Sequence, residues 1–224
     1  MGGALFVASL AYTAFTYAFT WSAPNGGMNS GLASPARLQA IALDTALLGV
    51  FALHHSVLAR ERVKARLARA IPARLLRSLY VWIASSLLIA ACSLWQSIGA
   101  ALYDSAGLLR GLHAAVQLAG LWLIAQSVRS IDPLELAGIR LRPAGALQTD
   151  GPYRLVRHPL YLGWILLVFG AAHMTGDRMA FAIMTTIYLV GAVPLEERSL
   201  VASFGSEYER YRRQVKWRMI PYLY

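Results

Sequence analysis

The feature that most constrains the fold of this chain is a series of long apolar stretches that contain few charged residues. They cover about residues 4–21, 38–59, 79–98, 108–128, 160–174 and 179–195. A helix needs about 20 apolar residues, with a range of about 17 to 25, to cross the hydrocarbon core of a bilayer. The first four stretches meet this length. The last two are short and are separated by residues 175–178, so we expect a tight helical hairpin with its turn there.

Composition supports a membrane protein, because apolar residues make up 57% of the chain and charged residues only 14%, against about 25% charged residues in a typical soluble domain. We therefore expect an all-α, polytopic membrane helix bundle with about six transmembrane helices. We expect a single domain, with a helical scaffold in residues 1–128 and a C-terminal cofactor-binding and catalytic part in residues 129–224. The first stretch has no positively charged residues before it, so we expect a retained helix rather than a cleaved signal peptide.

The basic residues are distributed unevenly along the chain, which has a net charge of +10. Of its 21 lysines and arginines, 18 fall in residues 60–77, 129–158 and 198–218. The other three fall in loops that lie outside if the N-terminus is cytoplasmic, and they are Arg37, Arg110 and Arg178. This positive-inside pattern predicts cytoplasmic N- and C-termini. Basic residues placed in this way bind anionic lipid, so the expected partner is the bilayer and not nucleic acid.

The chain offers little for a metal or a disulfide. Its one cysteine, Cys92, lies in the third apolar stretch and fits a small buried hydrophobe. The five histidines show neither H-x-x-x-H nor H-E-x-x-H spacing, so we expect no zinc or haem. The sequence also has no G-x-G-x-x-G after a strand pattern, which excludes a soluble Rossmann-type cofactor site.

Charged residues stand at the edges of the last two apolar stretches. Residues 151–161 read GPYRLVRHPLY, and residues 195–198 read LEER. Charges at such places are costly in a membrane, which makes them candidates for a functional site. Taken singly, Arg154 and Arg157 are equally explained as arginines that reach the interface, and Glu196 as the partner of Arg198 in a surface ion pair.

Local signals predict how this region folds. Pro159 fits the first position of a helix, which leaves His158 at or near its N-cap, beside the positive end of the helix dipole. Prolines and glycines interrupt residues 129–158, so we expect a cytoplasmic loop that could act as a lid. After Pro194 the helical spacing of apolar and charged residues predicts a helix over 195–211 that leaves the membrane along its surface. Its apolar stripe consists of Leu200, Phe204 and Tyr208.

Three elements follow one another in the C-terminal part. They are R-H-P-x-Y-x-G from Arg157 to Gly163, the acidic pair Glu196-Glu197, and F-G-x-E-Y-x-x-Y from Phe204 to Tyr211. In order and spacing they resemble the integral-membrane methyltransferases related to isoprenylcysteine carboxyl methyltransferase. The resemblance implies S-adenosylmethionine as the methyl donor. A site for this cofactor needs an acid for its ammonium, donors for its carboxylate, and aromatic or carbonyl groups near its sulfonium.

The resemblance also suggests roles for individual residues. Glu196 or Glu197 would hold the ammonium, and Arg157, His158 or backbone N–H groups at the helix start would hold the carboxylate. Gly163 would permit the close approach of the cofactor or of a neighbouring helix. The expected cofactor-binding residues are therefore Tyr153, Arg157, His158, Pro159, Tyr161, Gly163, Glu196, Glu197 and Tyr208.

Further stretches resemble the bacterial methanethiol S-methyltransferase branch of this family. They are residues 51–60 with their His54-His55-Ser56, residues 77–81, and His173-Met174-Thr175. The resemblance implies an enzyme of the bacterial inner membrane that methylates a small apolar thiol, with dimethyl sulfide as the product from methanethiol. Residues 131–140 agree less well with this branch. A nearby base or positive charge would raise the thiolate fraction of the acceptor, and the candidate catalytic residues for this are His55, Arg60 and His158.

Two kinds of alternative stay open. Residues 191–195, just ahead of the acidic pair, contain no cation, which favours a small thiol over a prenylcysteine carboxylate or a phospholipid amine as acceptor. From a different class, a non-enzymatic transporter or assembly factor would account for polar residues inside the scaffold, namely Asp44, His54, His55 and Gln117. It would leave the R-H-P and acidic-pair elements unexplained.

Overall fold

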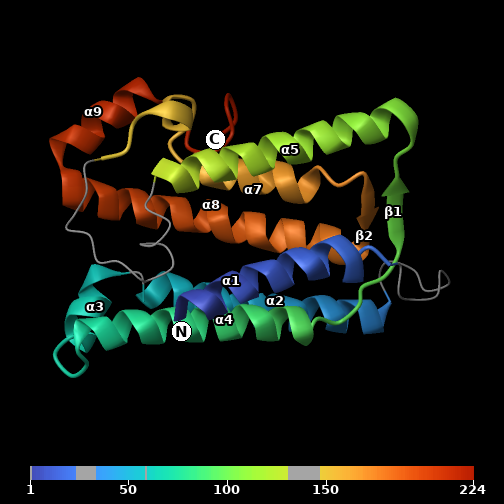
Figure 1. The fold of residues 1–224 in the computed structure, drawn as a ribbon, viewed down its shortest axis with the longest axis horizontal. Helices are drawn as coiled ribbons and strands as arrows, with labels where there is room; N and C mark the ends of the chain where they lie inside the picture. The colour runs from blue at the N-terminus through green and yellow to red at the C-terminus, as the bar shows by residue number, and fades with distance from the viewer. Residues whose placement is uncertain (1, 24–33, 59, 131–146) are drawn as a thin grey trace. The chain divides into compact units, whose positions relative to one another are not determined.

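The structure is a computed structural model that describes residues 2–23, 34–58, 60–130 and 147–224. In chain order its elements are α1 (Gly2–Phe15), a π-helical turn (Thr16–Thr20), α2 (Pro35–Leu58), α3 (Glu61–Leu67), α4 (Ala73–Ser93), β1 (Ala101–Asp104), α5 (Gly107–Ser130), a 3-10 turn (Gly151–Arg154), α7 (Pro159–Phe169), β2 (His173–Thr175), α8 (Gly176–Phe204) and α9 (Ser206–Gln214) (Figure 1). The described part of the chain is therefore largely helical.

Five of the described helical segments are long and apolar enough to cross a membrane, and α7 is a shorter apolar helix. The five are Gly2–Thr20, Pro35–Leu58, Leu75–Ser93, Gly107–Arg129 and Gly176–Phe204. Large apolar side chains on these helices are widely exposed, for example Leu108 at 82% and Leu118 and Ile187 at 66%. Such exposure is expected where lipid tails, rather than water, surround the helices. The predicted class, a polytopic helical membrane bundle, is confirmed.

The bounds of the two C-terminal membrane helices differ from the prediction. The predicted turn at 175–178 and the predicted span 179–195 are wrong, because α8 already begins at Gly176 and residues 170–175 make the connection from α7. Asp177 lies in the first turn of α8, where the helix dipole stabilises a carboxylate. The charges at 177–178 therefore belong to the start of a helix and not to a loop.

Pro194 does not end α8, so the separate surface helix predicted over 195–211 is also wrong. A proline has no N–H, which leaves the carbonyl of Val190 without its usual helical donor. The hydroxyl of Tyr224 donates to this carbonyl at 3.5 Å, and such substitute donors let membrane helices accommodate proline. The break comes instead at Gly205, whose φ of 53° is in the left-handed region that favours glycine, and α9 follows it.

The chain forms two compact units, and the first contains the described residues of 1–104 and 173–184. Within this unit α1 and α2 pack against α4 (Figure 1). Strand β1 pairs antiparallel with β2, with Asp104 opposite His173. The first unit thus combines one pair of short strands with helices in its described part.

Two buried carboxylates of the first unit hold the segment that follows α4. Asp177 accepts hydrogen bonds from the Trp95 indole at 2.9 Å and from the Ile98 N–H at 2.8 Å. Asp44 accepts the Gln96 N–H at 2.8 Å. A buried carboxylate is stable only when donors satisfy it. The contacts of Asp177 satisfy both of its oxygens and give it a structural role, whereas Oδ2 of Asp44 makes no hydrogen bond to the described residues.

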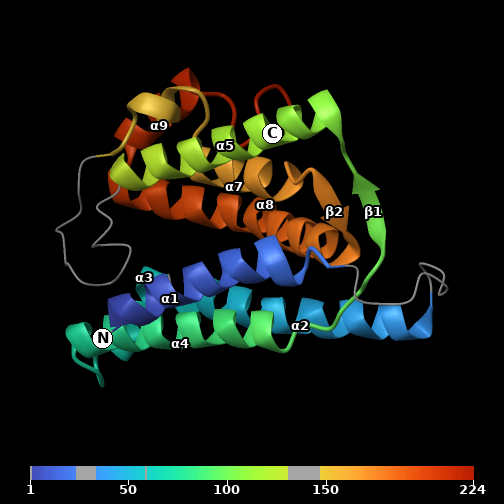
Figure 2. The same cartoon turned by 45° about the vertical axis from the view of Figure 1, so that its right-hand side comes forward.

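The second unit contains the described residues of 105–172 and 185–224. Here α5 and α7 lie side by side (Figure 2), with Leu123 of α5 packed against Val156 and Leu162. The two helices touch through glycines: a Cβ at Gly163 would lie 2.7 Å from the Gly120 carbonyl oxygen. Small residues of this kind let membrane helices approach each other closely. Of the two roles expected for Gly163, the structure supports contact with a neighbouring helix.

We predict that Gly163→Ala destabilises the protein by about 1–3 kcal/mol, because the new methyl group meets backbone that cannot move without separating the helices. Thermal unfolding of the solubilised protein measures this. The matched control is Gly191→Ala in α8, where an added Cβ meets nothing within 4 Å, so alanine should be neutral or stabilising by up to about 1 kcal/mol. If the two variants melt alike, the glycine contact does not hold these helices together.

Candidate functional site

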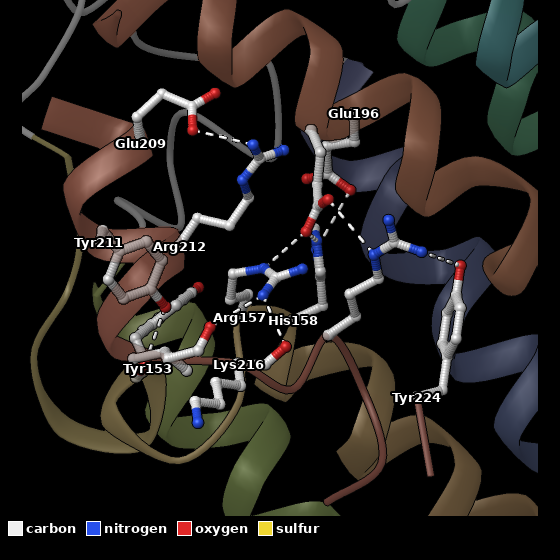
Figure 3. A network of polar contacts seen from close by, with 12 residues as sticks. Tyr153, Arg157, His158, Glu196, Glu209, Tyr211, Arg212, Lys216 and Tyr224 are labelled. Carbon is white, nitrogen blue, oxygen red and sulfur yellow. Dashed lines mark hydrogen bonds and ion pairs between the residues drawn. The ribbon is translucent and has the colours of Figure 1, made fainter. Parts of the chain in front are cut away.

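A buried ion pair lies at the centre of the candidate site, within the second unit (Figure 3). Arg157 precedes α7, and its Nε donates to Oε1 of Glu197 in α8 at 2.6 Å. Its Nη1 donates to the carbonyls of Val215 and Lys216, both at 2.8 Å. The two charged side chains are only 5% and 6% exposed. Because buried charges need this degree of pairing, Arg157 is committed to internal contacts.

His158 lies at the N-cap of α7 with Pro159 in the first helical turn, as predicted. Its imidazole ring stacks on the ring of Tyr161, with the centroids 5.4 Å apart. Nδ1 lies 3.5 Å from Oε2 of Glu196, and Nε2 lies 3.6 Å from Oε1 of Glu197. The acidic pair predicted from the sequence therefore meets the predicted histidine, which stands beside both carboxylates.

Glu196 is the accessible member of the acidic pair. Its side chain is 44% exposed, whereas that of Glu197 is buried. Tyr161 donates its hydroxyl to Oε2 of Glu196 at 2.8 Å. Burial and, secondarily, the Glu196 carboxylate raise the pKa of the Tyr153 phenol to about 12. Two phenols thus border a carboxylate that still faces outward.

Tyrosines of α9 pack beside the candidate site. Tyr208, Tyr211 and Val215 form a buried cluster, and Tyr211 donates its hydroxyl to the Tyr153 carbonyl at 2.8 Å. The predicted stripe is confirmed, because Leu200 and Phe204 pack on this cluster with Tyr208. Burial, followed by the Glu197 charge, raises the pKa of the Tyr208 phenol, so this group stays protonated. α9 thereby places a neutral hydroxyl near the buried carboxylate.

Two buried polar atoms of the site make no hydrogen bond to the described residues, although the first of them faces Oε1 of Glu197 at 3.6 Å. They are Nε2 of His158 and the hydroxyl of Tyr208. The residues that carry them are 7% and 1% exposed. Buried polar atoms are nearly always paired in proteins, so each unpaired one needs an explanation such as water or a ligand. Together with the exposed edge of Glu196, these atoms fit a ligand that carries both charged and hydrogen-bonding groups.

One residue of the site was not predicted from the sequence. Arg218 lies in the segment after α9, and its Nε is 3.4 Å from Oε2 of Glu197. It follows the acidic pair by about twenty residues and belongs to none of the three elements that suggested the site. The tertiary structure places Arg218 in the site, because the segment after α9 folds back onto the start of α7. There the His158 N–H donates to the Arg218 carbonyl at 2.8 Å.

Two of the three candidate catalytic residues lie in the first unit. His55 pairs through Nδ1 with the hydroxyl of Tyr80 at 2.8 Å, and Arg60 is exposed at the residue before α3. Their action on an acceptor stays a prediction. Of the candidate lid, the loop over residues 129–158, residues 131–146 lie outside the described residues.

Comparisons with known proteins show the family to which the chain is similar. The family model described as Phospholipid methyltransferase matches residues 110–207. Methanethiol S-methyltransferase of Crocosphaera subtropica is 37% identical over 195 residues, which cover 82% of this chain and 76% of that protein. Methanethiol S-methyltransferase 2 of Bradyrhizobium diazoefficiens is 33% identical, with coverage of 98% and 90%. Protein-S-isoprenylcysteine O-methyltransferase of Schizosaccharomyces pombe is 35% identical over 72 residues, 31% of this chain and 30% of that protein.

No solved structure matches the chain at a significant level. The matched family segment contains the ion pair Arg157–Glu197 together with His158 and Glu196. The similarity to the two bacterial relatives extends over most of both chains. This chain therefore belongs to the family of membrane methyltransferases that includes the methanethiol S-methyltransferases and carries a phospholipid methyltransferase domain.

Proposed function

We propose that this protein uses S-adenosylmethionine to methylate a small thiol, with methanethiol as the substrate and dimethyl sulfide as the product. The observation that carries the proposal is the half-exposed Glu196 carboxylate, which stands beside His158 and accepts the hydroxyl of Tyr161. The names of the bacterial relatives support the thiol as acceptor. We further propose a single membrane domain whose C-terminal part carries the cofactor site.

The charges of the site suit the amino-acid end of S-adenosylmethionine. Glu196 would hold the ammonium, because Glu197 is already paired with Arg157. The rings of Tyr153 and Tyr161 lie next to this carboxylate and would stabilise positive charge through their faces. When bound, the cofactor supplies a methyl group on a sulfonium, which a sulfur nucleophile displaces in line.

The contribution of the protein is orientation and exclusion of water. A thiol reacts as its thiolate, so positive charge or a base near the acceptor would raise the reactive fraction. We propose that this role falls to one of His55, Arg60 and His158. Residues 191–195 of α8 contain no cation, so an anionic acceptor would lack a partner there, which favours a compact apolar thiol that enters from the lipid.

We predict that the purified protein binds S-adenosylmethionine and produces dimethyl sulfide from methanethiol, measured by calorimetry and headspace gas chromatography. Prenylcysteine and phosphatidylethanolamine are tested in parallel by transfer of a labelled methyl group. If only prenylcysteine or only phosphatidylethanolamine is methylated, the small thiol is not the acceptor, but the proposal of S-adenosylmethionine as cofactor stands. No binding of the cofactor would reject the methyltransferase chemistry itself and favour a transporter or assembly factor.

We also propose that the protein lies in the bacterial inner membrane with both termini in the cytoplasm. The proposal is based on 18 of 21 basic residues falling in segments that would then be cytoplasmic. Reporter fusions at Arg69 and Tyr224 should report the cytoplasm, and a fusion at Asn25 the opposite side. An external signal at Arg69 would show that the orientation is the opposite one and that the cofactor enters from the other side of the membrane.

A further inference from the structure

The backbone of the segment after α9 is attached to the start of α7. The N–H groups of Arg157 and His158 donate to the carbonyls of Trp217 and Arg218 at 2.9 and 2.8 Å. Because these bonds involve consecutive residues on both segments, they fix Arg218 next to His158. Arg218 therefore belongs to the candidate site through its backbone, independently of its side chain.

The Arg218 side chain differs from that of Arg157 in what it leaves available. Arg157 is buried and donates to Glu197 and to two carbonyls. The Arg218 guanidinium approaches the same carboxylate at 3.4 Å, yet its side chain remains 36% exposed. Of the two arginines that face Glu197, Arg218 is thus the more exposed and offers its donors more readily to an anion that comes from outside the protein.

Tyr224 holds the Arg218 guanidinium in place. The central carbon of the guanidinium lies 5.1 Å from the centre of the Tyr224 ring, within the range of a cation–π contact. Arg218 Nη1 also donates to the Tyr224 hydroxyl at 3.2 Å. That hydroxyl donates in turn to the Val190 carbonyl, which Pro194 leaves without a helical donor. The proline inside α8 therefore creates the acceptor that anchors the tyrosine.

We propose that Arg218 binds the α-carboxylate of S-adenosylmethionine and that Tyr224 is the residue that positions it. The inference is based on the proposed use of this cofactor. The ammonium and the carboxylate of an amino acid are attached to one carbon, so their partners must lie close together. Glu196 and Arg218 are brought together by His158. The His158 ring stands beside Glu196, and its backbone N–H is bonded to Arg218. A guanidinium is suited to a carboxylate, which it binds through two parallel hydrogen bonds.

The test compares two ligands that differ in one group, S-adenosylmethionine and its decarboxylated analogue. We expect Arg218→Gln to weaken binding of the first about 10- to 100-fold, as expected for the loss of a charged hydrogen bond, and to leave binding of the second unchanged. Arg218→Lys should restore part of the affinity, because it keeps the charge but not the paired donors. The control is Arg212→Gln, whose partner Glu209 lies in the same helix, and which should alter neither affinity. Calorimetry on the solubilised full chain gives both constants.

Tyr224→Leu should weaken binding of S-adenosylmethionine about two- to fivefold through loss of the cation–π contact, again without an effect on the decarboxylated analogue. Tyr224→Phe keeps the ring and should lie between the wild type and Tyr224→Leu. Tyr222→Leu is the matched control, because Tyr222 is 88% exposed. If Arg218 and Tyr224 have only a structural role, their variants will weaken binding of both ligands equally, which would overturn the assignment. The assignment is also overturned if Arg218→Gln binds both ligands as the wild type does. If the wild type binds neither ligand, the proposed function itself fails.

Discussion

Replacing Arg157 by methionine should lower the free energy of unfolding by about 3–5 kcal/mol, the usual result of removing one partner of a buried ion pair. Glu197 would keep its charge in a site that is only 6% exposed. The carbonyls of Val215 and Lys216 would lose their donor as well. Reversible unfolding of the solubilised protein, followed by circular dichroism, measures the loss.

The matched control for this change is Arg154→Met, three residues earlier. Arg154 pairs with Asp150 at 2.7 Å, but the two side chains are 77% and 71% exposed, and such pairs contribute about 0–1 kcal/mol. A double variant, Arg157→Met with Glu197→Leu, should recover part of the stability, because both buried charges are removed and Arg218, which loses its contact with Glu197, is 36% exposed. Equal stability of the Arg157 and Arg154 variants would show that the buried pair does not support the fold of the second unit.

The second large effect is expected at Glu196. Glu196→Gln should weaken binding of S-adenosylmethionine about 10- to 100-fold, because the ammonium loses a charged partner. The free energy of unfolding should change little, since the side chain is 44% exposed and glutamine still accepts the hydroxyl of Tyr161. Calorimetry measures the affinity, and thermal unfolding of the same sample verifies the fold.

Glu209→Gln serves as the control, because Glu209 is also a partly exposed glutamate, paired with Arg212 at 2.8 Å. It should leave the affinity unchanged. If both glutamate variants weaken binding alike, the loss of affinity comes from the change in net charge of the protein and not from a specific site for the ammonium. If neither does, Glu196 does not hold the cofactor.

Several parts of this protein follow from local sequence. The first four spans were predicted because each has enough consecutive apolar residues to cross a bilayer, and a described helix lies at each of them, although the third ends at Ser93 and not at residue 98 as predicted. The N-cap at His158 followed from Pro159, whose fixed φ and missing N–H suit a first helical position. The R-H-P element and the acidic pair were also recognised as one site from their order, and the structure brings them within 3.5–3.6 Å.

Other parts follow only from contacts between distant residues. Pro194 is a local signal for the end of a helix, yet α8 continues to Phe204, because the carbonyl that proline leaves free has a donor 34 residues away in Tyr224. Gly163 was compatible with a cofactor or a helix, and its contact with Gly120 decides for the helix. No local pattern distinguishes these cases.

The sequence by itself determined that lipid surrounds the helices, that the fold is helical, and which charged residues form most of the candidate site. Hydropathy and motif order predict these properties because both depend only on residues that are near each other in the chain. The tertiary structure decided how those charges divide their roles. Burial leaves Arg157 and Glu197 bound to each other, while Glu196 and Arg218 keep exposed edges. The cost of an unpaired charge depends on its surroundings, and those surroundings are provided by residues 215–224, which no motif connects to the acidic pair.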